Sequence, residues 1–161
     1  DIVPMVEALF TAAKSAGYDI MLASGYRSYT LQKTYYDNYV RVSGETEANK
    51  FSAKPGQSEH QTGLAFDISL TNRSCYLETC FADTDAAKWL AAHASEYGFV
   101  LRYPADKTDV TKYQYEPWHF RYVGKDLAQA LHDSGLTLDE AYSYLQTTRQ
   151  KLLDQKLITT E

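Results

Sequence analysis

Two short motifs about fifty residues apart constrain the fold of this chain most, because their side chains can form one metal site only if the fold brings them together. The first motif holds His60 and Asp67, and the second, which reads Glu-Pro-Trp-His, holds Glu116 and His119. Two imidazoles and one carboxylate give a zinc ion three protein ligands and leave its fourth position open, as in a catalytic zinc site. Glu116 is then left over as a base.

The spacing of the first motif predicts a turn followed by a strand. His60 and Asp67 are seven residues apart, so on one continuous strand their side chains would point to opposite faces. Gly63 can supply the turn, because glycine tolerates positive φ and close approach of another backbone. Apolar and polar residues then alternate over 64–69, which is the period of a strand. We therefore place His60 on the loop that enters the strand, and Asp67 within it.

The second motif resembles the Glu-x-x-His part of helical zinc peptidases, but its proline argues against a helix. Pro117 moves the preceding residue, Glu116, out of the α region towards extended conformations. The following residues, 118–123, are aromatic or β-branched and predict a strand. On a straight strand Glu116 and His119 would face opposite ways, so we expect the proline to kink the chain and bring both to one site.

Each of these residues also has an ordinary interpretation. An isolated histidine is usually a surface or satisfied core residue, and an isolated aspartate can bond to nearby backbone, so single motif matches carry false positives. His93 and His132 illustrate this, because both lie in helix-like segments without a carboxylate or glycine pattern, and we assign them to helix surface. The complete set around His60 and His119 is far harder to obtain by accident.

The remaining pattern predicts an α+β fold with an antiparallel sheet, because helices and short strands are mixed without a repeating βαβ rhythm. Helices are expected at 3–16, 30–42, from a cap at Asp83 or Thr84 to about 97, at 125–134, and at about 137–154, with strands at 20–24, 64–69, 99–103 and 118–123. Segments 43–57 and 104–114 are predicted to be polar loops. Thr137 and Glu140 have the spacing of a capping box. We expect a single domain over 1–161, with the last helix at its periphery.

Composition limits the function classes. The 161 residues are 44% hydrophobic and 23% charged, which is ordinary for a soluble globular domain. Sixteen Lys and Arg residues against 21 Asp and Glu give a formal charge of −5, so nothing electrostatic favours nucleic acid as a partner. No run approaches the roughly 20 apolar residues of a membrane-spanning helix. The sequence begins at Asp1 without a signal peptide, so we expect any export signal or anchor to precede it.

The two cysteines, Cys75 and Cys80, lie close together in a polar connection. We expect a disulfide, because a close and even pair fits an oxidising compartment. Two free thiols are the alternative. A second zinc site is not expected with only two soft ligands.

The motifs together resemble one family. They are the run Ser-Glu-His-Gln-Thr-Gly-Leu-Ala-Phe-Asp at 58–67, Glu-Pro-Trp-His at 116–119, and the segments 24–32 and 98–104. On these residues the chain resembles the VanY-like D-alanyl-D-alanine carboxypeptidases, and LdcB-type L,D-carboxypeptidases share the pattern. The resemblance covers about residues 1–135 and does not account for 71–83. It implies a LAS-type metallopeptidase fold, with a zinc site on a small central antiparallel sheet flanked by helices.

The resemblance also implies roles for individual residues. The implied zinc ligands are His60, Asp67 and His119, the base is Glu116, the group facing the substrate's carboxylate or scissile carbonyl is Arg27, and the pocket-lining residues are Gln32, Ser58, Tyr103 and Trp118. Without the resemblance, Arg27 is more simply a surface or capping arginine. Trp118 can pack in the core as easily as line the pocket.

The implied function is a zinc-dependent carboxypeptidase that releases the terminal D-Ala of peptidoglycan stem peptides between two D-alanines. An L,D-carboxypeptidase acting on tetrapeptide stems uses the same ligands, and an endopeptidase that cuts within cross-links is a further alternative. A non-catalytic zinc or wall-binding module is the alternative from another class, and the intact Glu116 speaks against it. We expect a monomer located outside the cytoplasm, in the cell envelope or secreted, that is anchored by a segment preceding this sequence and meets a stem peptide or its precursor there.

Overall fold

A four-stranded antiparallel sheet lies at the centre of the chain, as the mixture of helices and short strands predicts. The structure is a computed structural model that describes residues 2–159. The strands are β1 (Ile20–Ser24), β2 (Ala65–Leu70), β3 (Phe99–Leu101) and β4 (His119–Tyr122), in the order β1-β2-β4-β3. All three pairings are antiparallel. The α+β fold class with a small antiparallel sheet is therefore confirmed.

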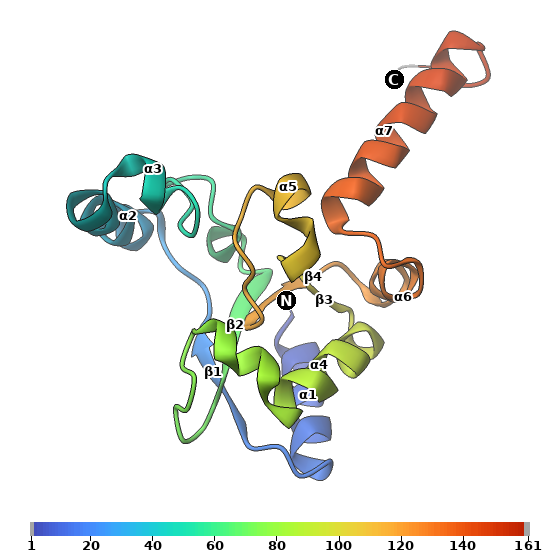
Figure 1. The fold of residues 1–161 in the computed structure, drawn as a ribbon. Helices are drawn as coiled ribbons and strands as arrows, with labels where there is room; N and C mark the ends of the chain where they lie inside the picture. Colours follow the sequence, from blue (N-terminus) through green and yellow to red (C-terminus); the bar gives the residue numbers. More distant parts are fainter. Residues whose placement is uncertain (1, 160–161) are drawn as a thin grey trace.

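Helices surround the sheet (Figure 1). The α-helices are α1 (Val3–Ser15), α2 (Tyr29–Ser43), α3 (Glu45–Ala48), α4 (Asp85–His93), α5 (Thr108–Thr111), α6 (Lys125–Ser134) and α7 (Leu138–Asp154). Short 3-10 helices are η1 (Glu59–Thr62), η2 (Thr79–Asp83), η3 (Ala94–Tyr97) and η4 (Ala105–Lys107). In the view of Figure 1, α1 and α4 lie on one side of the sheet, and α2 with α3 lies at its edge beyond β1.

The alternation of side chains along the strands separates a core face of the sheet from a polar face. Phe66 and Ile68 of β2 and Phe120 of β4 join the main apolar cluster, together with Leu9 of α1 and Leu90 of α4. These five side chains are at most 2% exposed. The residues between them on β2 and β4 point to the opposite face, so the packed core supports the polar groups there from below.

The predicted element boundaries hold to within a few residues, with three corrections. The strand expected at 118–123 begins only at His119, because residues 117 and 118 form a turn. The strand expected at 99–103 ends at Leu101. The helix expected to reach residue 97 ends at His93, and a 3-10 turn continues it. Thr84, rather than Asp83, accepts the capping bond, from the backbone N–H of Ala87.

The two segments predicted as polar loops contain short helices. Helix α3 lies within 43–57, and η4 and α5 lie within 104–114. None of the three exceeds four residues. One turn is too short to show a helical period in a sequence, which is why the pattern did not reveal them.

The expected disulfide between Cys75 and Cys80 is present, with the Cα atoms 5.5 Å apart. It closes the loop of residues 75–80 within the segment between β2 and α4, and η2 begins at the end of this loop. Phe81 anchors this segment, because its side chain is fully buried in the apolar cluster. Leu77, in the middle of the closed loop, has a φ of 53°, an unusual value for a residue with a branched side chain.

Helix α7 extends away from the rest of the chain (Figure 1). None of its side chains is buried. The predicted capping box is present, since Thr137 accepts from the backbone N–H of Glu140 and the Glu140 carboxylate accepts from the backbone N–H of Thr137. Among the described residues, no helix combines the length and apolar character needed to cross a bilayer.

The two histidines assigned to helix surface lie away from the polar face. His132 is exposed on α6. His93, at the end of α4, is half-buried; its ring stacks on Trp89 at 4.8 Å and its Nδ1 lies 2.7 Å from the carboxylate of Glu96.

Candidate active site

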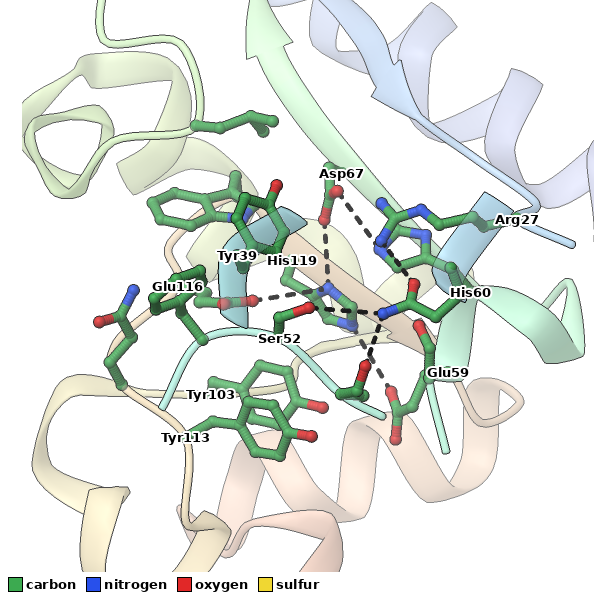
Figure 2. Close-up of a pocket in the computed structure, with 17 residues that line it drawn as sticks. Arg27, Tyr39, Ser52, Glu59, His60, Asp67, Tyr103, Tyr113, Glu116 and His119 are labelled. Carbon is green, nitrogen blue, oxygen red and sulfur yellow. Dashed lines mark hydrogen bonds and ion pairs between the residues drawn. The ribbon is translucent and has the colours of Figure 1, made fainter. Parts of the chain in front are cut away.

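Asp67 and His119 lie directly opposite each other on neighbouring strands. They are register partners in the β2–β4 pairing. Cross-strand partners on one face of an antiparallel pair hold their Cβ atoms only about 4.5–5.5 Å apart. Their side chains meet accordingly, with 3.1 Å between Asp67 Oδ1 and His119 Nδ1. Figure 2 shows the two groups pointing into the same pocket.

His60 reaches the same point from η1, the 3-10 turn that precedes β2. Gly63 ends this turn with a φ of 70°, as its position in the motif predicts. His60 therefore lies on a short helical turn rather than on an irregular loop. Its Nε2 lies 3.3 Å from Asp67 Oδ2, and its Nδ1 lies 2.8 Å from the carbonyl oxygen of Gly25. Donation from Nδ1 to that carbonyl leaves the Nε2 lone pair facing Asp67.

The donor atoms of His60, Asp67 and His119 fit a metal ion. All three side chains are buried, and one ligand atom of each lies within 4.8 Å of the others. The two carboxylate oxygens of Asp67 each contact one of the two imidazoles. Burial alone would raise the pKa of Asp67, but its hydrogen bonds to His119 and His60 hold that pKa below the usual range. An ionised carboxylate and two imidazole nitrogens at one buried point form the donor set of a catalytic zinc site.

Glu116 lies next to this group and does not belong to it. A tight turn runs from Glu116 to His119, closed by the backbone N–H of His119, which donates to the carbonyl of Glu116 at 3.1 Å. The turn is the kink predicted from Pro117, and it brings Glu116 Oε2 to 3.7 Å from His119 Nδ1. Burial, helped by the negative charge of Asp67, raises the pKa of Glu116 to about 7. A carboxylate with a pKa near neutrality is suited to accepting and returning a proton.

Arg27 stands just beyond the end of β1, as expected. Its Nη1 donates to Gln32 Oε1 at 2.9 Å and its Nη2 donates to Ser24 Oγ at 3.0 Å. Its backbone N–H donates to the carbonyl of His60 at 3.1 Å, and its guanidinium lies 5.2 Å from the ring of Tyr35. These contacts fix the charged group at the wall of the cleft and leave part of it accessible.

All nine residues singled out from the sequence line one cleft of about 240 Å³. Gln32 is fully buried and donates to the carbonyl of Ala53 at 2.7 Å, so it holds Arg27 on one side and the following loop on the other. Tyr103 lies against His119, with ring centroids 5.0 Å apart. Trp118 belongs to the apolar cluster and also lines the cleft, so both interpretations of this residue hold. Ser58 is buried at the entrance to η1.

The cleft also contains residues that the sequence did not reveal. They are Tyr39, Phe51, Ser52, Ala53, Glu59, Leu77, Tyr113 and Gln114. Glu59 is the charged residue among these eight. It lies between two arginines, and its Oε2 is 3.6 Å from His119 Nε2. Its place in the motif, one residue before a candidate ligand, was the only available signal. Tyr113 stacks on Tyr103 at 4.7 Å, and nothing local in its loop predicts that contact.

Comparison with known families and proteins gives a consistent result. The family model described as VanY, D-alanyl-D-alanine carboxypeptidase, matches residues 1–125. YodJ, a protein of Bacillus subtilis that is named a carboxypeptidase, is 49% identical over 137 residues, which are 85% of this chain and 50% of YodJ. VanXYC of Enterococcus gallinarum, a bifunctional D-Ala-D-Ala dipeptidase and carboxypeptidase, is 42% identical over 82% of this chain and 71% of its own length. The chain thus spans about half the length of YodJ and more of VanXYC.

Solved structures agree with these relatives. The L,D-carboxypeptidase LdcB superposes with a TM-score of 0.83 at 47% identity, covering 88% of this chain and 66% of LdcB. VanYB in complex with D-alanine-D-alanine has a TM-score of 0.78 at 35% identity, covering 88% of this chain and 80% of VanYB. A mutant of the D,D-pentapeptidase VanY, in complex with Zn(II), has a TM-score of 0.76 at 35% identity, covering 86% and 80%. These neighbours include both D,D- and L,D-cleaving enzymes.

Proposed function

Because the chain belongs to the VanY family of D-alanyl-D-alanine carboxypeptidases, we propose that it is a zinc-dependent carboxypeptidase that removes the terminal D-alanine from peptidoglycan stem peptides. One observation carries this proposal. A single cleft combines a buried donor set for a metal, a buried carboxylate with a pKa of about 7, and a fixed guanidinium. Each of the three parts has a role in metal-assisted hydrolysis of a peptide bond next to a free carboxylate.

We assign the metal to His60, Asp67 and His119. His60 would bind through Nε2 and His119 through Nδ1, because these nitrogens face the Asp67 carboxylate. The complex of a VanY relative with Zn(II) supports zinc as the ion. When bound, zinc supplies Lewis-acid activation of a water molecule and polarisation of the scissile carbonyl.

Glu116 is the proposed general base and then the general acid. Its carboxylate accepts a proton from the attacking water as the water oxygen bonds to the carbonyl carbon. The same proton then passes to the amide nitrogen as the C–N bond breaks, which leaves a carboxylic acid on the shortened peptide and a free amine on D-alanine. The second proton of the water then leaves the acid for the released amine or the solvent, which gives the carboxylate. The raised pKa of Glu116 supports both steps, since a group with a pKa near the working pH both takes and gives a proton readily.

Arg27 is proposed to set the orientation of the bound peptide in the cleft. Its guanidinium can pair with the terminal carboxylate of the peptide or stabilise negative charge on the scissile carbonyl oxygen. Gln32 and Ser24 hold it in position through hydrogen bonds at 2.9 and 3.0 Å. A positive group fixed at the wall of the cleft supports a carboxypeptidase over an endopeptidase, whose substrate continues on both sides of the bond.

Cleavage after an L-centre in a tetrapeptide stem is a second candidate. It is favoured by the greater similarity to LdcB, at 47% identity and a TM-score of 0.83, than to VanYB, at 35% and 0.78. The donor set and Glu116 serve both reactions, so the difference must arise where the cleft contacts the residue before the terminal D-alanine.

The test is direct. The zinc-loaded protein is incubated separately with a muropeptide pentapeptide and a tetrapeptide, and release of D-alanine is followed by mass. Loss of one D-alanine from the pentapeptide supports the D,D assignment, and loss from the tetrapeptide supports the L,D assignment. Release of D-alanine from neither peptide refutes the carboxypeptidase.

We further propose that residues 1–161 act as one monomeric domain outside the cytoplasm. The disulfide between Cys75 and Cys80 supports an oxidising location. Peptidoglycan, the proposed source of the substrate, lies in the same place.

A further inference from the structure

The two nitrogens of His119 face different carboxylates. Nδ1 points to Asp67 at 3.1 Å and to Glu116 at 3.7 Å, on the side of the cleft. Nε2 points the other way, to Glu59 Oε2 at 3.6 Å (Figure 2). A histidine that binds a metal through one nitrogen carries its proton on the other, and that proton needs an acceptor.

Glu59 can accept this proton through Oε2, while its other oxygen, Oε1, is held by two arginines. Its Oε1 accepts from Arg102 Nε at 2.8 Å and lies 3.2 Å from Arg121 Nη1. Its Oε2 and the Nε2 of His119 are both buried, and within residues 2–159 neither has a hydrogen-bond partner. A buried polar atom without a partner costs roughly 1–3 kcal/mol. Each of these two atoms can therefore serve as the hydrogen-bond partner of the other.

A second contact extends this arrangement to the C-terminal helix. Arg102 uses its Nε for Glu59, and its two terminal nitrogens, Nη1 and Nη2, donate to the two oxygens of Asp139, with Nη2 to Oδ1 at 3.2 Å. Asp139 is in the first turn of α7. The Arg102 side chain, which is only 11% exposed, thus bridges the two carboxylates. Its guanidinium also lies 4.9 Å from the ring of Tyr103.

We propose that Glu59 is a positioning residue for His119, and that Asp139 positions Glu59 through Arg102. Glu59 accepts the Nε2 proton of His119, which fixes the ring and leaves Nδ1 for the metal. Asp139 holds Arg102 in the orientation that turns Glu59 towards His119. The proposal rests on the zinc assignment made above and adds a role for helix α7, which lies beyond residues 1–125 of the family match.

Zinc affinity, measured by competition with a chelator on the full chain, tests the proposal without substrate. Outer partners of a metal-binding histidine typically contribute 10- to 100-fold to metal affinity, so Glu59→Gln should weaken zinc binding by about that factor. Asp139→Asn should weaken it roughly two- to fivefold, as expected for a partly exposed ion pair. The matched control is Glu140→Gln in the same helical turn: Glu140 pairs with Lys107 rather than Arg102, and glutamine preserves the capping box. Its zinc affinity should stay within twofold of the wild type.

Two further measurements separate positioning from folding. The thermal unfolding midpoint of each metal-free variant shows whether the fold is intact, and Glu59→Asp retains the charge near the arginines while withdrawing the oxygen from His119. In zinc-loaded wild type, long-range 1H–15N NMR should show His119 protonated at Nε2 with a slowly exchanging proton, and in Glu59→Gln and Glu59→Asp that proton should exchange faster.

The outcomes are distinct. The role of Glu59 is overturned if Glu59→Gln and Glu59→Asp bind zinc with an affinity within twofold of the wild type. The role of α7 is overturned if the zinc affinity of Asp139→Asn is unchanged. A wild-type chain that binds zinc with this dependence on Glu59, yet cleaves neither stem peptide, refutes the proposed function and leaves the present inference standing. A wild-type chain that binds no zinc overturns both.

Discussion

Replacing Glu116 by glutamine should stabilise the metal-free fold while removing most of the activity. The side chain is 7% exposed, and burial raises its pKa from 4.5 to about 7. At about 1.4 kcal/mol for each pKa unit, the ionised carboxylate then costs the folded state about 3 kcal/mol relative to the unfolded chain. Glutamine has the same shape and no charge, so it does not carry this cost.

The cost depends on pH with a definite sign. Below pH 4.5 Glu116 is protonated in both the folded and the unfolded chain, and the substitution should leave the free energy of unfolding unchanged. Between pH 4.5 and about 7 the unfolded chain loses the proton first, so the cost to the wild type grows, and above pH 7 it is complete. The gain of Glu116→Gln should therefore be near zero at pH 4 and about 3 kcal/mol at pH 8, which corresponds to roughly 6–12 °C in unfolding temperature.

The assay compares wild type, Glu116→Gln and a control, Glu47→Gln, by urea and thermal unfolding of the metal-free proteins at pH 4 and pH 8. Glu47 is an exposed glutamate paired with Lys50, and its replacement should change stability by less than about 0.5 kcal/mol at either pH. In the zinc-loaded form, Glu116→Gln should bind zinc and lose roughly 10²- to 10⁴-fold in kcat, the usual contribution of a positioned base. A variant no more stable than wild type at pH 8 would refute the burial argument, and turnover within tenfold of wild type would remove Glu116 from the mechanism.

Three further predictions concern the substrate, the pH profile and the disulfide. Arg27→Ala should reduce kcat/KM for the stem peptide roughly 10- to 100-fold, the contribution of a hydrogen bond to a charged group, with zinc content unchanged; unfolding of this variant would show that the arginine is structural. The rate of the zinc-loaded enzyme should rise with pH through a pKa between 4.5 and about 7, because Glu116 must be deprotonated to act and the zinc charge lowers its pKa from the metal-free value; a flat profile from pH 4 to 8 would contradict this. Replacing Cys75 and Cys80 together by serine should destabilise the fold by about 2 kcal/mol, the loop-closure value for so short a loop, measured by urea unfolding with a single Ser74→Ala substitution as control.

The sequence was sufficient for the parts of the site that depend on local chain geometry. Gly63 marks the end of the turn that carries His60, and Pro117 marks the turn that brings Glu116 beside His119; both are confirmed by the backbone. Turn residues of this kind act over three or four positions, so their effect can be read directly. Resemblance to a family then supplied Arg27, which no local rule distinguishes from a capping arginine.

The sequence was insufficient where contacts depend on how distant segments pack. Arg102 lies 43 positions from Glu59 and 37 from Asp139, and no periodicity relates these three residues. Tyr113 reaches the cleft only because its loop folds back over Tyr103. Charged and aromatic residues in polar loops look alike in a sequence, whether they face water or a site.

The register between β2 and β4 gives the metal a place in folding as well as in chemistry. Asp67 and His119 are opposite each other only in the native pairing. A slip of one residue would turn Asp67 into the apolar side and put Phe66 or Ile68 in its place. Every misaligned sheet would thus lack the donor set, and a bound ion would favour the correct alignment in proportion to its affinity. Metal binding would therefore stabilise the native register of the sheet over the misaligned ones.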